Sequence, residues 1–102
     1  MKRTHALAQL QSSLAEAEAL LASHGDIYVV SRLAGLRARL EKGDRTAIVT
    51  ALIESTGSMG SLQDRYLCPE NGDQIAADEV EDVNARLRGP VESIKLAAEA
   101  AQ

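Results

Sequence analysis

The sequence predicts an all-α protein, a compact four-helix bundle that forms a single domain over residues 1–102. Apolar residues recur at helical spacing in four segments, and almost no segment alternates between apolar and polar residues. The only aromatic residues are two tyrosines, with no Phe and no Trp. A core of small aliphatic side chains suits close-packed helices better than a β-sheet, and 102 residues leave room for one such core.

The first expected helix covers residues 4–22. Thr4 is a suitable N-cap, and Ser23-His24-Gly25 provides a stop with glycine at the C-terminal position. The apolar positions on one side of this helix are Leu7, Leu10, Leu14, Ala17 and Leu21. Their spacing of three and four residues predicts an amphipathic helix.

Two further helices are expected before residue 57. Asp26 is suited to cap the second, whose apolar stripe is Val29, Leu33, Leu36 and Leu40. Residues 27–30 alone would prefer a strand, but the longer helical period outweighs that local preference. Gly43 ends this helix, Asp44 opens the third and Gly57 ends it. The inward positions of the third are Ala47, Ile48, Ala51 and Leu52.

The segment 55–74 has no sustained period, so it is expected to be a long irregular connection that contains glycines. The last helix follows it, with its apolar face at Val80, Val83, Leu87, Val91, Ile94 and Ala98. Pro90 lies within this face without shifting its phase, which predicts one kinked helix. The alternative is that Gly89-Pro90 ends one helix and starts another.

Composition bears on location and on partners. The net charge of −4 argues against nucleic-acid binding, which needs clustered Lys and Arg. The longest apolar runs have four residues, such as 27–30, whereas a membrane-spanning helix needs about 20, so no membrane partner is expected. A single cysteine, Cys68, and no evident signal peptide favour a reducing, cytoplasmic location.

Charge is distributed unevenly along the chain. The segment 70–82 contains no Lys or Arg, and its acidic residues are Glu70, Asp73, Asp78, Glu79, Glu81 and Asp82. The segment 32–45 is basic through Arg32, Arg37, Arg39, Lys42 and Arg45. One interpretation is that both are solvated faces that attract each other within the fold. The other is that the acidic segment attracts a basic partner.

Catalytic and metal-binding patterns are missing from the sequence. A zinc site would need Cys68, His5 and His24, which lack ligand spacing. The run 70–73 superficially resembles a calcium loop but lacks the alternating ligands of an EF-hand, and negative charge at the start of a helix explains it better. We therefore expect no catalytic residue, no metal and no cofactor.

The densest local pattern is Gly57-Ser58-Met59-Gly60-Ser61-Leu62-Gln63-Asp64. The structural interpretation is a rigid chain reversal that packs Met59 and Leu62 on the bundle, with Ser61 and Asp64 as a capping pair. The functional interpretation is a preorganised surface that contacts a ligand or partner through its backbone and polar side chains. The following Asp64-Arg65-Tyr66 then supplies an exposed interface anchor.

These residues resemble a family of small bacterial helical proteins of unknown function. In that family a Gly-Asp opens a short helix, and a Gly-Met-Gly-Ser-x-x-Asp loop and a C-terminal helix follow. The matches are Gly43-Asp44 and then Met59-Gly60-Ser61 with Asp64, within residues 40–100. The sequence departs from the pattern at Ser58, Leu62 and Gln63. The resemblance implies a loop that is a candidate site, and no activity.

The function expected from these features is non-catalytic protein binding. One version is an immunity protein that neutralises a cognate bacterial toxin, with a basic toxin domain as its partner. The expected partner-binding residues are Ser58, Ser61, Asp64, Arg65, Tyr66, Glu70, Asp73, Asp78, Glu79 and Glu81. The alternatives are a homodimeric structural or regulatory protein and, more weakly, a small enzyme that uses Ser61 and Asp64.

Overall fold

The computed structural model describes residues 2–57 and 59–102, and it confirms the all-α prediction. The four α-helices are α1 (Lys2–Ser23), α2 (Ile27–Glu41), α3 (Thr46–Thr56) and α4 (Val80–Ala101). Between α3 and α4 lie the short 3-10 helices η1 (Leu62–Asp64), η2 (Pro69–Asn71) and η3 (Ala77–Glu79). The described part of the chain contains no strand.

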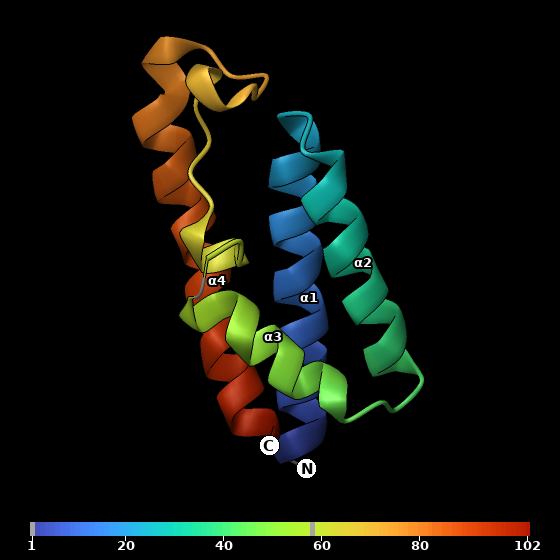
Figure 1. Ribbon diagram of the computed structural model, residues 1–102. Coiled ribbons are helices and arrows are strands. Elements are labelled where there is room, and N and C mark those ends of the chain that lie inside the picture. The colour runs from blue at the N-terminus through green and yellow to red at the C-terminus, as the bar shows by residue number, and fades with distance from the viewer. Residues whose placement is uncertain (1, 58) are drawn as a thin grey trace.

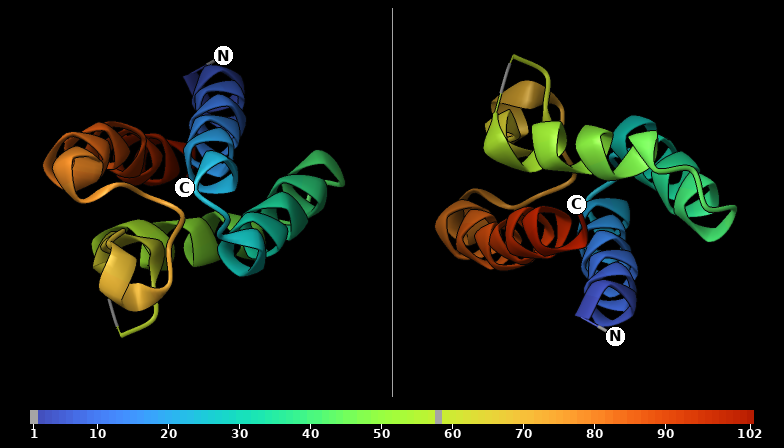
Figure 2. Two further views of the ribbon diagram at one scale, coloured as in Figure 1. Left: turned by 90° about the horizontal axis from the view of Figure 1, so that it is seen from above. Right: turned by 90° about the horizontal axis from the view of Figure 1, so that it is seen from below.

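The helices form an elongated bundle of 43 × 22 × 20 Å (Figure 1). α1 lies between α2 and α4 and runs antiparallel to both, while α3 crosses the half of the bundle where the chain begins and ends. The views along the bundle show α3 packed across the other helices (Figure 2), and the two termini lie at one end of the bundle (Figure 1). The connection 57–79 consequently runs along α4 to the opposite end.

The predicted apolar stripes form the core. In α2 the four stripe residues are all buried, and so are the last four stripe residues of α1 and the first three of α3. Leu7 and Leu52 are only partly buried and pack against the core from its edge. The alternative preference of residues 27–30 for a strand is overridden, because Val29 enters the core as part of a helix.

The expected helix ends at Asp26 and Gly57 are confirmed. Asp26 caps α2, because its Oδ1 accepts a hydrogen bond from the Val29 nitrogen at 3.0 Å. Gly57 ends α3 with φ 97°, in the region that favours glycine. A Cβ there would also lie 2.3 Å from Oε1 of Gln63, but this is the end of an exposed, flexible side chain that can move, so the positive φ is the main reason for glycine here.

Asp44 marks the start of α3, as the sequence indicated, although the first helical residue is Thr46. Oδ1 of Asp44 accepts hydrogen bonds from the Thr46 nitrogen at 3.0 Å and from Thr46 Oγ1 at 2.7 Å. Arg39 Nε lies 2.8 Å from the other carboxylate oxygen. The hydrogen bond from the Thr46 hydroxyl, followed by that from Arg39, lowers the pKa of Asp44 to about 2.

The last helix is continuous through Pro90, which lies buried inside α4. Five of the six expected apolar positions are buried, and Val80 at the helix start is partly buried. The prediction of one helix through the proline is therefore confirmed, and the alternative of two helices is wrong. No helix in the described part of the chain is long and apolar enough to cross a membrane.

The expected attraction between the basic and acidic segments is not what the structure shows. Arg32 pairs with Glu54, Arg37 with Glu18 and Arg39 with Asp44, so the arginines of α2 find carboxylates outside residues 70–82. The Arg37 pair ties α2 to α1, and the hydrogen bond that Arg37 donates to Glu18 raises the pKa of Arg37. The arginines of the basic segment that form ion pairs therefore do not neutralise the acidic segment 70–82, as the first interpretation had expected.

Candidate functional site

Polar contacts hold the connection 57–79 to α2, α3, α4 and the turn between α1 and α2. At its end, the Gln74 nitrogen donates to the carbonyl oxygen of His24 at 3.0 Å. His24 Nδ1 lies 2.7 Å from the carbonyl oxygen of Gln74. This pair joins the connection to the turn between α1 and α2, at the end of the bundle away from the termini.

Glu54 holds the start of the connection. This carboxylate is only 7% exposed, and its Oε1 accepts a hydrogen bond from the Leu62 nitrogen at 2.8 Å. Arg32 Nε lies 2.7 Å from its other oxygen, and Arg32 Nη2 also donates to the Gly60 carbonyl oxygen at 3.0 Å. α2, α3 and η1 therefore meet at one buried carboxylate.

Arg65 holds the middle of the connection. Its Nε lies 2.8 Å from Asp26 Oδ2, its Nη2 pairs with Asp73, and its Nη1 donates to the Tyr66 carbonyl oxygen. Burial tends to lower the pKa of Arg65, but the hydrogen bonds to Asp26 and Asp73 together outweigh burial and raise it. The expectation that Arg65 is part of an exposed anchor is wrong, because its guanidinium group forms ion pairs with Asp26 and Asp73 inside the fold.

Asn84 joins the connection to α4. Its Oδ1 accepts from the Leu67 nitrogen and its Nδ2 donates to the Leu67 carbonyl oxygen, both at 2.8 Å. Nδ2 also donates to the Val80 carbonyl oxygen at 2.7 Å. Leu67 itself is fully buried, so this short extended segment is fixed on both its backbone and its side chain.

The expected acidic surface is present in part. Glu70, Asp78 and Glu81 are exposed and make no ion pair within the described residues. Glu79 is exposed as well, but its Oε1 accepts from the Ala76 nitrogen at 3.1 Å and caps η3. Asp73 differs from these, because its carboxylate is 6% exposed and binds Arg65 and the Cys68 nitrogen. We call Glu70, Asp78, Glu79 and Glu81 the acidic end.

Tyr66 lies in the connection between η1 and η2 and is 52% exposed. Its carbonyl oxygen accepts hydrogen bonds from Arg65 Nη1 at 2.8 Å and from Asn71 Nδ2 at 3.0 Å. The backbone is thus fixed while the ring faces solvent. An aromatic side chain on a rigid backbone is a common anchor in protein interfaces, because little conformational entropy is lost on binding.

The loop 57–64 contains a second set of expected site residues. Ser58 lies outside the described residues. Ser61 is 8% exposed, so it is buried in the fold, and Asp64 is exposed but accepts a hydrogen bond from the Gly60 nitrogen at 3.3 Å. The packing prediction is right for Leu62, which is 1% exposed, and wrong for Met59, which is 98% exposed.

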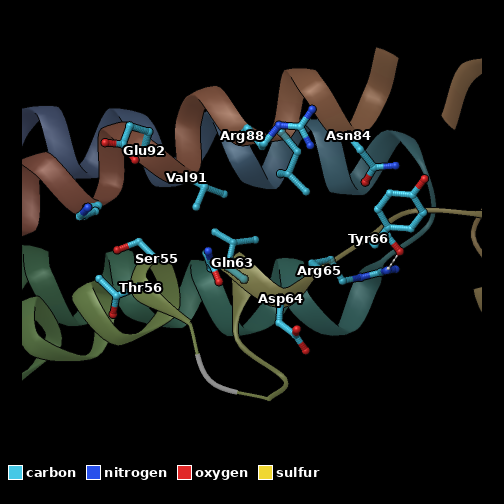
Figure 3. A pocket seen from close by; sticks show the side chains of 13 residues that line it. Ser55, Thr56, Gln63, Asp64, Arg65, Tyr66, Asn84, Arg88, Val91 and Glu92 are labelled. Carbon is cyan, nitrogen blue, oxygen red and sulfur yellow. Dashed lines mark hydrogen bonds between the residues drawn. The ribbon is translucent and has the colours of Figure 1, made fainter. Parts of the chain in front are cut away.

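A groove of about 540 Å³ separates α4 from η1 and the end of α3 (Figure 3). Leu62, Leu87 and Val91 line it with apolar surface, while Arg88, Glu92 and Lys95 line it from the α4 side. Val91 and Gln63 point toward one another across the groove in Figure 3. No pattern in the sequence indicated a functional role for Arg88, Glu92, Lys95, Glu54 or Asn84. Asn84 follows Val83 on the buried side of α4, and a polar residue at such a position is the one sequence signal that could have indicated its role.

The described residues contain no cluster of three or more His, Cys, Asp or Glu side chains suited to a metal ion. The arrangement offers charge, an exposed ring and hydrogen-bonding groups for recognition.

No family model matches the chain, and no curated protein or solved structure matches it.

Proposed function

We propose that the protein acts by binding another protein, and that the contact surface consists of the acidic end and Tyr66. The observation that supports this most directly is the pairing of the other charges. Arg65 and the arginines of α2 are engaged within the fold, whereas Glu70, Asp78 and Glu81 make no ion pair in the part of the chain that the structure describes. The unbalanced carboxylates therefore face solvent at one end of the bundle.

The chemistry of that surface selects a basic partner. Negative charge concentrated at one end steers a positively charged protein toward it, and the steering raises the association rate. The ring of Tyr66 then provides apolar contact area beside the charges, which slows dissociation. The fixed backbone of Tyr66 and Leu67 keeps this surface in a binding-ready geometry.

One specific version of this function is neutralisation of a basic toxin domain by a cognate immunity protein. A small acidic helical domain that covers a basic surface suits such a task, and the net charge of −4 supports it. A toxin gene next to the gene for this protein would favour this version over a general binding role.

The proposal is tested by photo-crosslinking in cells of the source organism. A photoreactive phenylalanine analogue replaces Tyr66 in one variant and Lys42, an exposed residue of the basic segment, in the matched control. We expect a basic protein to be crosslinked from position 66 and not from position 42. Capture from position 42 alone, or the same products from both positions, would show that the acidic end is not the contact surface.

A further inference from the structure

The dipeptide Asn71-Gly72 lies at the end of η2, in the part of the bundle away from the termini (Figure 1). Both residues are exposed, and Gly72 takes the left-handed conformation with φ 83°. Apart from its chain neighbours, no described atom would lie within 4 Å of a Cβ at Gly72. Solvent therefore reaches the peptide bond that joins the two residues.

An asparagine followed by glycine is chemically labile, because the next backbone nitrogen can attack the side-chain amide carbon and glycine has no side chain to hinder the approach. At Asn71 the Gly72 nitrogen loses its proton to a base of the solvent and forms a bond to Cγ. The bond from Cγ to Nδ2 then breaks, and the amide nitrogen takes up a proton and leaves as ammonia. The product is a five-membered cyclic imide.

Water opens this imide at either of its two carbonyl carbons. Cleavage between the nitrogen and Cγ gives aspartate with a normal backbone. Cleavage between the nitrogen and the backbone carbonyl carbon gives isoaspartate, in which the chain contains an extra methylene group. Water is the only co-reactant and no electrons are transferred, so the net change at residue 71 is from a neutral amide to a carboxylate.

The fold holds both of the groups that react. The Gly72 nitrogen donates a hydrogen bond to the Pro69 carbonyl oxygen at 2.9 Å, and Asn71 Nδ2 donates to the Tyr66 carbonyl oxygen at 3.0 Å. Both bonds must break before the nitrogen can attack Cγ. Because η2 is a single 3-10 turn without a buried residue, its opening costs much less than global unfolding.

The reaction also changes the surroundings of Tyr66. The Tyr66 carbonyl oxygen accepts one hydrogen bond from Arg65 Nη1 and one from Asn71 Nδ2. A carboxylate at position 71 has no proton to donate, and its charge repels the carbonyl oxygen. Of these two bonds, only the one from Arg65 then remains, and a new negative charge stands next to Glu70.

We propose that Asn71 is a site of spontaneous deamidation, that the opening of η2 sets its rate, and that the product loosens the backbone of Tyr66. This inference concerns the chain alone and holds whether or not Tyr66 contacts a partner.

The first test is peptide mapping by mass spectrometry after incubation of the purified chain at neutral pH. The chain supplies its own control in its other asparagine, Asn84, which is 5% exposed, precedes an alanine and is hydrogen-bonded to Leu67. We expect aspartate and isoaspartate at position 71 and an unmodified Asn84. In guanidinium chloride, Asn71 should react about tenfold faster or more, since opening of η2 limits the rate in the folded chain.

The second test is the carbonyl carbon chemical shift of Tyr66, measured by NMR. Asn71→Asp reproduces one product and should move this shift upfield, as expected for a carbonyl group that loses a donor. Glu70→Gln changes the charge of the neighbouring residue without removing the donor, and it should leave the shift unchanged.

Three results would overturn the proposal. An Asn71 that stays intact after prolonged incubation of the folded chain would contradict the site itself. Equal rates in the folded and the unfolded chain would contradict the control by η2. An unchanged Tyr66 shift in Asn71→Asp would contradict the effect on Tyr66.

Discussion

The side-chain amide of Asn84 binds the backbone of Leu67 much as a neighbouring β-strand would, with one hydrogen bond accepted and one donated, both at 2.8 Å. Asn84 is 5% exposed and Leu67 is fully buried, so these bonds are largely shielded from water. The extended segment before η2 therefore satisfies its backbone on a helix rather than on another strand, and it carries Tyr66 beside it.

We expect Asn84→Ala to destabilise the protein by about 2–4 kcal/mol, because it leaves the nitrogen and carbonyl oxygen of Leu67 buried without partners. Urea denaturation measures the change. Glu99→Ala, at an exposed position of the same helix, is the matched control and should change the free energy of unfolding by less than about 0.5 kcal/mol. An Asn84→Ala variant as stable as this control would mean that the Leu67 segment is not held by Asn84.

Arg65→Ala is expected to cost about 3 kcal/mol in the free energy of unfolding. It removes the shared cation from Asp26 and Asp73, whose side chains are 9% and 6% exposed, and so leaves two buried carboxylates unpaired. Arg65→Lys should recover little of the loss, since an ammonium group lacks the planar fork that reaches both carboxylates and the Tyr66 carbonyl oxygen. Thermal unfolding distinguishes the two variants, and full recovery by lysine would rule out a specific role for the guanidinium geometry.

Asp44 should contribute to the acid sensitivity of folding. Its pKa is about 2 in the folded protein against an ordinary value of 3.8, so from about pH 4 to about pH 2 the unfolded chain binds more protons at this residue. Its stabilising contribution is therefore present above about pH 4 and is lost as the pH falls toward 2. Asp44→Asn should reduce the slope of stability against pH in this window only. An equal slope in both proteins, measured by denaturation at each pH, would contradict the assignment.

Tyr66→Ala is expected to raise the dissociation rate of the protein partner about tenfold or more, with little change in the association rate. The chain offers a matched control in its other tyrosine, Tyr28, which is 77% exposed on α2 beneath Arg32. Tyr28→Ala should leave both rates unchanged. Surface plasmon resonance with the captured partner measures them, and a larger effect at Tyr28 would move the contact surface to α2.

Local sequence signals predicted the helices because the same residues that set the period also form the core. The stripe Val29, Leu33, Leu36 and Leu40 is buried as expected, and the phase kept across Pro90 correctly indicated one helix. Asp26 caps the start of α2 and Gly57 ends α3, as their residue types predicted. These features depend on residues within one or two helical turns of each other.

The candidate site was less predictable, because its geometry depends on contacts between distant segments. Arg65 reaches Asp26 across 39 positions and Asn84 reaches Leu67 across 17, and no local pattern encodes either pair. No local pattern encodes the ion pair between Glu54 and Arg32 either. From the sequence, Arg32 was expected to belong to a solvated basic face. Met59 was expected to pack on the bundle because it is apolar, but its side chain is exposed in the glycine-containing loop.

The most direct test of the proposed contact surface is the salt dependence of the association rate with the captured partner. Asp78→Lys and Glu81→Lys reverse exposed charges of the acidic end, whereas reversal of Glu79 would also remove the cap of η3. We predict that the wild-type rate falls as salt rises, because the Debye length shrinks to about 8 Å at physiological ionic strength, and that both variants associate more slowly with a weaker salt dependence. An association rate that ignores both salt and these reversals, but responds to Lys42→Glu or Arg45→Glu in the basic segment, would contradict the claim that the acidic end binds the partner.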